Sequence, residues 1–168
     1  MVETLMRDIA NGQFHWLYHM VNSKRPLEEK MTLFWHHVFA TGETKIMNTY
    51  EMTTQIKMLR KLGMGNYRDL LLELAKNPAM IYWLDNNENH KREPNENWAR
   101  ELLELFSMGV GHYSEDDVKE CARAFTGWTS TTELRGTPWG PVPWLFEYNA
   151  EDHDHSEKTF LGKTGRLN

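Results

Sequence analysis

The sequence lacks the features that would place it in a disulfide-rich, membrane or nucleic-acid-binding class. It has one cysteine, Cys121, which excludes an internal disulfide framework and a thiolate-rich zinc site. No apolar run approaches the ~18 residues that a membrane-spanning helix needs. The formal net charge of -5 is the opposite of the basic excess that a general nucleic-acid binder shows. We therefore expect neither a membrane span nor a nucleic-acid partner.

Common functional motifs are also missing. The first residues do not have the charged-then-apolar layout of an export signal, and there is no phosphate-binding glycine loop, nucleophile elbow or dinucleotide fingerprint. What is present is a chain of 168 residues, the size of one domain, with 7 Trp and 10 Met. These exceed what a small helical bundle buries, so we expect an exposed apolar patch and a homo-oligomer.

Helical periodicity runs through the first 128 residues. The most apolar helix is predicted over residues 27–40, where hydrophobic side chains lie nearly all round, so we expect it to be central and buried. Asn11-Gly12 is predicted to break the first helix. The other predicted helices, bounded by Gly, Pro and capping residues, cover residues 3–22, 45–62, 67–76, 78–84, 95–108 and 115–126.

The character of the sequence changes after Trp128. Residues 129–168 are rich in Trp, Pro and Gly and have no helical period, and extended segments near 144–149 and 158–161 are predicted, with a possible hairpin. We therefore predict a mainly α fold, a compact bundle of five or six helices with an irregular, partly extended C-terminal arm. The expected division is a helical domain of residues 1–128 and an arm of residues 129–168 packed on the helices.

The helix that follows Asn95 carries a polar strip. Two carboxylates three residues apart, Glu101 and Glu104, can face one metal ion or act as an acid and a base. The alternative is a solvated face in which Arg100 and Glu104 form an ordinary ion pair. On a helical wheel Trp98, Leu102, Leu105 and Phe106 share the apolar face, and the strip opposite holds Asn97, Arg100, Glu101 and Glu104.

His36, near the end of the most apolar helix, is a candidate metal ligand or general base, because neutral imidazole serves in both roles. The alternative is a histidine that interacts with the free carbonyls and the dipole at the helix C-terminus. His15 and His19 lie one turn apart, and we interpret them as ordinary helix surface.

The C-terminal arm holds two further candidate groups. His153 and Asp154 lie in a run of carboxylates and imidazoles that can bind a divalent ion, although a solvated turn is the commoner fate of such a run. Trp139 and Trp144, among prolines, can stack on sugars or on a partner protein, or can pin the arm to the helices.

Several motifs occur together and in order, and this combination resembles the large bacterial family known only as domain of unknown function 1800. The resemblance covers nearly the whole chain. The motifs are Pro26-Leu27-Glu28-Glu29-Lys30-Met31-Thr32-Leu33-Phe34-Trp35-His36, Ala75-Lys76-Asn77-Pro78-Ala79-Met80, Leu84-Asp85-Asn86, residues 94–106, Gly109-Val110-Gly111, residues 117–120, residues 122–128, His153-Asp154 and residues 158–162.

The resemblance implies a mainly helical, usually exported protein, and members are much longer than this chain, which looks like an internal fragment of one. It implies no activity, because none is established for the family. The family pattern after Trp35 is His, any residue, His, Phe, whereas here His36 is followed by His37, Val38 and Phe39. A displacement of one residue turns a side chain by ~100° around a helix. His37 therefore does not point where the second histidine of the family pattern would, and a two-histidine site is not expected to be inherited.

Two classes of function follow from the residues. The first is a hydrolase, with or without a divalent metal ion, acting on a small molecule or polysaccharide. In it Arg100 clamps an anion, Asn97 contacts the substrate, and the catalytic and metal-ligating groups are His36, Glu101, Glu104, His153 and Asp154. The second is a non-catalytic binding module that holds a partner protein or polysaccharide through Trp139 and Trp144.

Overall fold

The protein is mainly α-helical. The computed structural model describes residues 2–132 and 142–167, and side chains from residue 10 onward. Within these ranges there are eight α-helices and two small two-stranded sheets. The helices are α1 (Val2–Asn22), α2 (Pro26–Phe39), α3 (Glu43–Ile46), α4 (Thr49–Leu62), α5 (Tyr67–Ala75), α6 (Pro78–Trp83), α7 (Asn97–Glu104) and α8 (Glu115–Ala124). The sequence predicted a helix at each of these places except α3, since residues 43–46 were not given a helix of their own.

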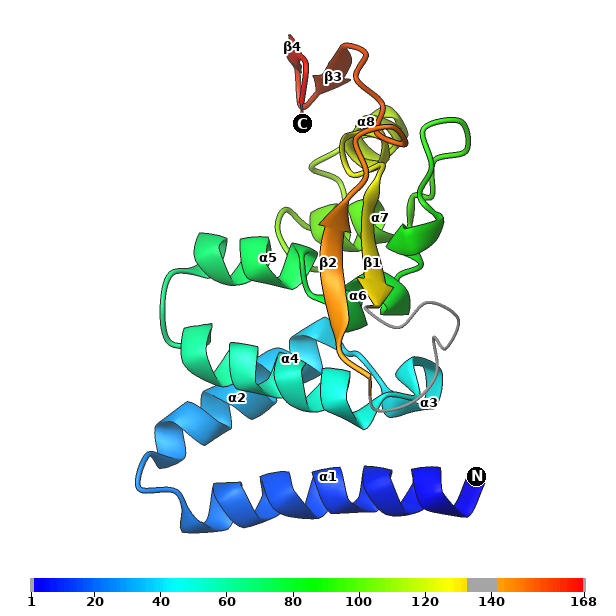
Figure 1. The fold of residues 1–168 in the computed structure, drawn as a ribbon. Coiled ribbons are helices and arrows are strands. Elements are labelled where there is room, and N and C mark those ends of the chain that lie inside the picture. The colour runs from blue at the N-terminus through cyan, green and yellow to red at the C-terminus, as the bar shows by residue number, and fades with distance from the viewer. Residues whose placement is uncertain (1, 133–141, 168) are drawn as a thin grey trace. The chain divides into compact units, whose positions relative to one another are not determined.

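The chain divides into two compact units. The first comprises residues 1–79 and 132–144, and the second comprises residues 80–131 and 145–168. The elements of each unit can be followed by their labels in Figure 1. The C-terminal segment contributes to both units, and the expected division at residue 128 stays a prediction. Among the described residues, no helix is long and apolar enough to cross a membrane.

The first unit is built on α1 to α5. Asn48 and Asn66 cap α4 and α5 by accepting hydrogen bonds from the first free backbone N–H groups of these helices. A buried ion pair joins α2 to α4, because Arg60 Nε donates to Glu29 Oε1 at 2.6 Å, and Trp16 of α1 donates to the same carboxylate. The apolar core of the unit contains Phe39, Ile46, Met52, Leu59, Leu70, Leu74 and Ala75.

Helix α2 is not buried all round, which corrects the expectation from its composition. Leu27, Leu33 and Phe34 are each about half exposed, whereas the buried positions are Glu29, Thr32 and Phe39. The helix ends at Ala40, which adopts a left-handed conformation with φ 41°, two residues before the glycine that was expected to stop it.

The second unit has its core between α7 and α8. Ser114 and Asp117 form a complete capping box at the start of α8, as the sequence predicted. Helix α7 stops at Glu104 rather than at Met108, so Leu105 lies beyond the helix and is 61% exposed instead of sharing the apolar face. The buried residues that pack between the two helices are Ala99, Leu103, Val118, Cys121 and Ala122.

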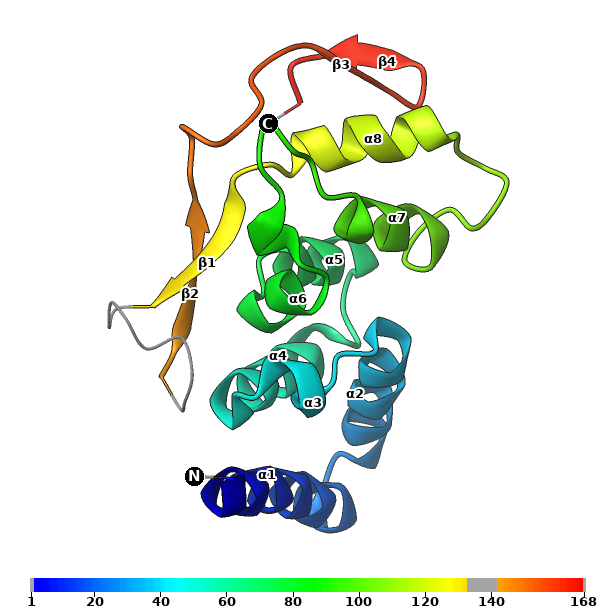
Figure 2. The same cartoon turned by 90° about the vertical axis from the view of Figure 1, so that its right-hand side faces the viewer.

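The strands lie after α8. β1 (Trp128–Thr132) pairs with β2 (Trp144–Tyr148), and the two run in opposite directions in Figures 1 and 2. β3 (Lys158–Phe160) pairs antiparallel with β4 (Lys163–Gly165), with Thr159 opposite Thr164. The two extended segments were predicted within one or two residues. The two segments do not pair with each other in a hairpin. Each pairs instead with a strand that the sequence pattern had not indicated, β2 with β1 and β3 with β4.

Candidate functional site

His36 lies on the wall of a cavity in the first unit. The cavity has a volume of about 300 Å³, at the lower end of the range of roughly 300–1,000 Å³ that small-molecule sites occupy. Four helices of this unit contribute to it, and they are shown in Figure 2. The lining includes apolar and hydroxyl-bearing side chains of α1, of α4 and of the segment between α2 and α3, among them Trp16, Met52, Ile56, Thr41, Thr49 and Thr53.

The imidazole of His36 is held in a form that can accept a proton. Burial lowers its pKa from the usual 6.5, and the neighbouring His37 lowers it further. The ring packs edge-on against Trp16, with the centroids 5.2 Å apart. Its Nδ1 atom is buried and has no hydrogen-bond partner within the described residues. Since buried polar atoms in proteins are nearly always hydrogen-bonded, an unpaired imidazole nitrogen beside a cavity is an unusual feature.

Glu43 lines the same cavity and is held toward its protonated form. It is the first residue of α3, and Thr49 Oγ1 donates to its Oε1 at 3.1 Å. Burial raises the pKa of this carboxyl, and the hydrogen bond from Thr49 offsets only part of that effect. Because Thr49 uses one carboxyl oxygen, the other oxygen remains for the proton. The carboxyl can therefore act as a proton donor.

The turn that brings Glu43 to the cavity was not evident from the sequence, which predicted one helix over residues 45–62. Met47 adopts a left-handed conformation with φ 52°, and Asn48 then caps α4, so the segment forms two helices with a corner between them. A left-handed methionine costs free energy that the surrounding contacts must offset. The side chain of Asn48 also donates to Val142 O, which helps to fix the corner.

Buried hydrogen bonds hold the wall residues in place. Thr41 donates to Gln55 Oε1, and Gln55 Nε2 donates to Asn77 Oδ1 at 3.0 Å, so that α4 is tied to the segments before and after it. Among the described residues that line the cavity, none is Lys, Arg or Asp. A neutral imidazole, a carboxyl of raised pKa and three hydroxyls suit acid–base chemistry on an uncharged ligand better than anion binding.

The polar strip of α7 lies in the second unit. Arg100 pairs with Glu96 at 3.0 Å and with Glu115 of α8 at 2.8 Å, rather than with Glu104. These pairs raise the pKa of the Arg100 guanidinium. Asn97 is exposed, and its side chain donates to Asp85 at 3.4 Å. Arg100 thus has two carboxylate partners and bridges α7 to α8.

The two carboxylates of the strip differ in their surroundings. Burial raises the pKa of Glu101, and the nearby charge of Glu104 raises it further. Glu104 accepts a hydrogen bond from the hydroxyl of Tyr113 at 3.2 Å. They therefore remain candidates for an acid–base pair. Because His36 belongs to the first unit and these two residues to the second, a site shared by all three stays a prediction.

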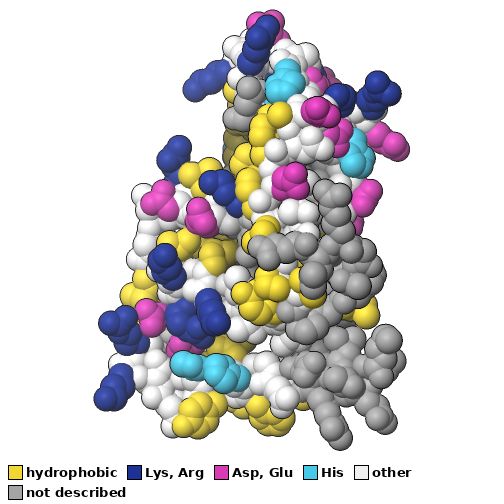
Figure 3. All heavy atoms as spheres, viewed as in Figure 1, with side chains coloured by type: hydrophobic (Ala, Val, Ile, Leu, Met, Phe, Trp, Pro, Cys, Tyr) yellow, Lys and Arg dark blue, Asp and Glu magenta, His cyan; other side chains and the backbone are white. Residues whose placement is uncertain are grey.

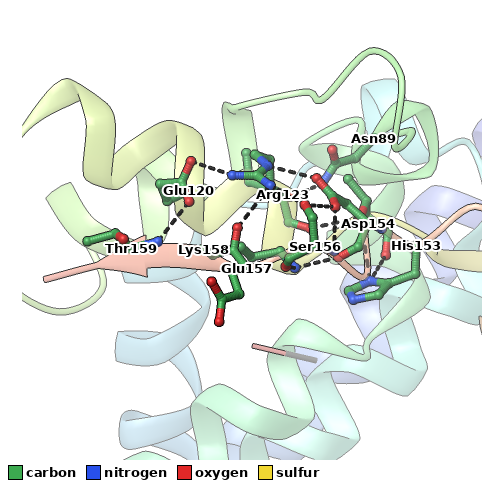
Figure 4. Close-up of polar contacts among 11 residues, drawn as sticks. Asn89, Glu120, Arg123, His153, Asp154, Ser156, Glu157, Lys158 and Thr159 are labelled. Atoms are coloured by element: carbon green, nitrogen blue, oxygen red, sulfur yellow. Dashed lines mark hydrogen bonds and ion pairs between the residues drawn. The ribbon is translucent and has the colours of Figure 1, made fainter. Parts of the chain in front are cut away.

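Asp154 takes part in a polar network on α8, shown in Figure 4. Arg123 Nε donates to Asp154 Oδ2 at 2.7 Å, and Arg123 also pairs with Glu120 at 2.6 Å. Burial acts to raise the pKa of Asp154, but the hydrogen bonds from Arg123 and Ser156 outweigh it and hold the pKa well below its usual range. Both carboxylate oxygens are engaged, by Arg123 and Ser156.

His153 and Lys158 are the buried members of the same region, each 1% exposed. His153 Nδ1 lies 2.8 Å from Thr126 O, and Lys158 Nζ donates to the backbone carbonyls of Asp154 and Ser156. The His153 contact ties this loop to Thr126, just after α8, and the Lys158 contacts lie within the loop itself. Within the part of the chain that the structure describes, no three His, Cys, Asp or Glu side chains gather into a group able to hold a metal ion.

Of the two tryptophans predicted to bind a ligand, the structure describes only Trp144. Trp139 lies outside the described residues. Trp144 is only 7% exposed, and its backbone N–H donates to the buried Glu51 Oε1 at 2.7 Å. It is therefore packed into the first unit, which fits the alternative that it pins the arm, and it offers no open ring face for a sugar.

Two functional candidates were missed by sequence reasoning. Glu43 was given no role, although it follows Gly42 directly after the apolar helix, and it reaches the His36 cavity only because α3 and α4 form a corner. Arg123 organises the network of Figure 4 and was quoted only as part of a motif. Its single signal was an arginine within the otherwise small and apolar run Cys121-Ala122-Arg123-Ala124-Phe125.

The fold defines a mainly helical protein with a small cavity in one unit and an arginine-centred network in the other. The chain belongs to the family described as Protein of unknown function (DUF1800), whose model matches residues 2–167. This confirms the resemblance seen in the sequence motifs. No curated protein and no solved structure shows a significant match to the chain.

Proposed function

We propose that the protein is a hydrolase whose catalytic cavity lies in the first unit, with His36 as the general base and Glu43 as the general acid. The observation that carries the proposal is that the unpaired imidazole of His36 and the carboxyl of Glu43 line one cavity of about 300 Å³. Pairs of titratable groups with contrasting environments are typical of acid–base sites.

In this reaction His36 accepts a proton from a water molecule as the water oxygen attacks the electrophilic centre of the substrate. Glu43 donates its proton to the leaving oxygen or nitrogen as the scissile bond breaks. A proton then passes from His36 back to Glu43 through solvent, which restores both groups. The hydroxyls of Thr41 and Thr49 donate to Gln55 and Glu43, so their oxygens can only accept a hydrogen bond from the substrate, whereas the hydroxyl of Thr53 can donate or accept.

The pH dependence follows from the required protonation states. Activity needs His36 neutral and Glu43 protonated, and burial shifts the pKa of each group in the direction that favours this state. The pH profile of kcat/KM is expected to be bell-shaped with its optimum on the acid side of neutrality, since it falls when His36 gains a proton and when Glu43 loses one.

The test is a comparison of four variants on uncharged nitrophenyl esters and glycosides. His36→Gln and Glu43→Gln are each expected to lower kcat/KM by about 10²-fold or more, because each removes one proton-transfer group. The matched controls are His37→Gln, next to His36 but exposed, and Glu28→Gln, which pairs with Arg25 on the surface. Equal losses in a control and in its partner, with unchanged helicity, would refute the assignment.

A metal-assisted form of the reaction rests on His36, Glu101, Glu104, His153 and Asp154. The acid–base form has more support, since the oxygens of Asp154 are engaged by Arg123 and Ser156, and His153 is hydrogen-bonded to Thr126. Metal analysis of the tag-free chain separates the two forms. More than about a tenth of an equivalent of a transition metal after reconstitution, lost in Glu101→Ala, would favour the metal-assisted form.

A further inference from the structure

Helix α1 has apolar side chains on two opposite faces. Gly12 and Trp16 line the His36 cavity, so this face is turned toward the rest of the first unit. At about 100° per residue, the outer face lies roughly 140° away around the helix. It carries hydrophobic side chains at positions i, i+3, i+4 and i+7, which we name the α1 stripe: Phe14, Leu17, Tyr18 and Val21.

The α1 stripe is open to solvent. Phe14 is 70% exposed, Leu17 55%, Tyr18 68% and Val21 75%. The outer face of a surface helix normally carries polar and charged side chains. Figure 3 shows two patches of hydrophobic side chains at the lower edge of the molecule, where Figure 1 draws α1. A contiguous exposed apolar stripe of this kind marks an interaction surface.

The stripe lies in a segment without formal charge. Residues 9–23 contain no Lys, Arg, Asp or Glu, in a chain in which 26% of residues are charged. The titratable side chains of this segment are His15 and His19, so covering the stripe requires no desolvation of a Lys, Arg, Asp or Glu charge. Helices that bind membrane surfaces place Lys and Arg beside their apolar face, and this segment has none. The missing charge favours a partner surface that is itself apolar and uncharged.

We propose that the α1 stripe is the interface through which two copies of this chain form a two-fold symmetric dimer. In a two-fold contact a surface meets its own copy, so an uncharged apolar stripe is complementary to itself without any opposite charge. The spacing i, i+3, i+4, i+7 is the one with which helices pack against helices. Each α1 is then covered on one side by its own unit and on the other by the second copy.

The size of the stripe sets the strength of the dimer. Four side chains that bury ~100–150 Å² each remove roughly 500 Å² per copy, or about 1,000 Å² in total. This is near the lower limit for a specific interface, about 1,000–1,200 Å². The dimer is therefore weak, and monomer and dimer exchange over an ordinary range of protein concentration.

Sedimentation velocity of the full chain tests the proposal over roughly 1–300 μM protein, where weak interfaces dissociate. The mass of the wild type is expected to rise from the monomer value of 19.9 kDa toward twice that value. Leu17→Glu places two like charges in the two-fold contact and is expected to weaken association at least tenfold. The matched control is Leu105→Glu, at a site 61% exposed in the second unit, which is expected to leave association unchanged.

A cross-link shows whether the two stripes touch each other. Tyr18 is near the middle of the stripe, so a two-fold axis there brings the two copies of residue 18 within disulfide reach. Tyr18→Cys is expected to form a disulfide-linked dimer at micromolar protein, and Leu105→Cys is not. The native Cys121 is buried, and burial raises its pKa to about 12, so it does not compete.

Three results would overturn the proposal. The first is a monomer at every concentration, and the second is an equal loss of association in Leu17→Glu and Leu105→Glu. The third is a chain that stays monomeric in solution but binds phosphatidylcholine vesicles in a way that Leu17→Glu abolishes, which would assign the stripe to a lipid surface. Circular dichroism of each variant confirms that helicity is unchanged.

Discussion

The first unit carries 11 Lys and Arg against 9 Asp and Glu, whereas the second carries 8 against 15. Lys and Arg side chains gather over α4 and α5 of the first unit in Figure 3. In the second unit, where carboxylates are in excess, Arg100 and Arg123 each form ion pairs with two of them. In the first unit the notable titratable groups, His36 and Glu43, lie beside a cavity and are shifted toward their neutral forms.

This difference separates two uses of polar side chains. In the second unit Arg100 and Arg123 each pair with two carboxylates, and the pair of Arg123 with Asp154 holds the segment before β3 on α8. In the first unit His36, beside the cavity, has a buried Nδ1 atom without a hydrogen-bond partner among the described residues, which costs stability. The comparison supports the proposal that the catalytic groups lie in the first unit, whereas most of the ion pairs described above lie in the second and one buried pair lies in the first.

The largest expected change in stability comes from breaking the buried pair of Arg60 and Glu29 in the first unit. Arg60→Ala leaves Glu29 buried without its guanidinium partner, and burial of an uncompensated carboxylate is expected to cost about 3–5 kcal/mol of unfolding free energy. Urea denaturation measures it. Arg25→Ala, which removes the exposed pair with Glu28, is the control and is expected to change stability by less than about 0.5 kcal/mol. Similar small losses in both variants would show that Glu29 is solvated.

A smaller loss of stability is expected when the ion pairs of Arg123 in the second unit are removed. Arg123→Ala removes the partner of Asp154 and Glu120, but these groups are partly exposed, so water replaces some of the lost interaction and a cost of about 2–3 kcal/mol is expected. Hydrogen exchange is expected to accelerate over β3 and β4 in particular. Lys119→Ala, which breaks an exposed pair with Asp116, is the matched control. Uniform acceleration over the whole chain would contradict a local clamp.

Local signals in the sequence predicted the helices well. Asn66 before α5 and the Ser114–Asp117 capping box before α8 both act as expected, because capping depends on residues only a few positions apart. The predicted break at Asn11-Gly12 does not occur, and α1 continues to Asn22. There Gly12 lies close to Thr49 of α4, so the glycine serves helix packing rather than a turn.

The candidate site was only half predictable, for a physical reason. His36 was selected because an interior polar group on an apolar helix needs an explanation. Glu43 was not, because its position depends on the left-handed Met47 and on packing that no short-range pattern encodes. Likewise Arg123 and Asp154 are 31 residues apart, and their pairing is a tertiary contact. Side chains whose role depends on distant partners are the ones that sequence periodicity leaves unassigned.

The smallest expected effect is on the pH dependence of stability, which has opposite signs for two histidines, His36 in the first unit and His90 in the second. Burial lowers the pKa of His36 below 6.5, so the unfolded chain binds more protons as pH falls below that value, and His36 then destabilises the fold. The hydrogen bond to Asp152, at 2.5 Å, raises the pKa of His90, so its stabilisation is present below pH 6.5 and is lost as pH rises through the folded pKa.

Thermal unfolding between pH 5 and 8 measures both effects as differences in stability between each variant and the wild type. The contributions of titratable groups that the variant and the wild type share cancel in this difference. His36→Gln is expected to gain stability relative to the wild type as pH falls from 7 to 5, whereas His90→Gln is expected to lose it. His37→Gln, adjacent but exposed, serves as the control for charge alone. If His36→Gln and His37→Gln respond to acid in the same way, His36 is solvated and the cavity does not hold it neutral.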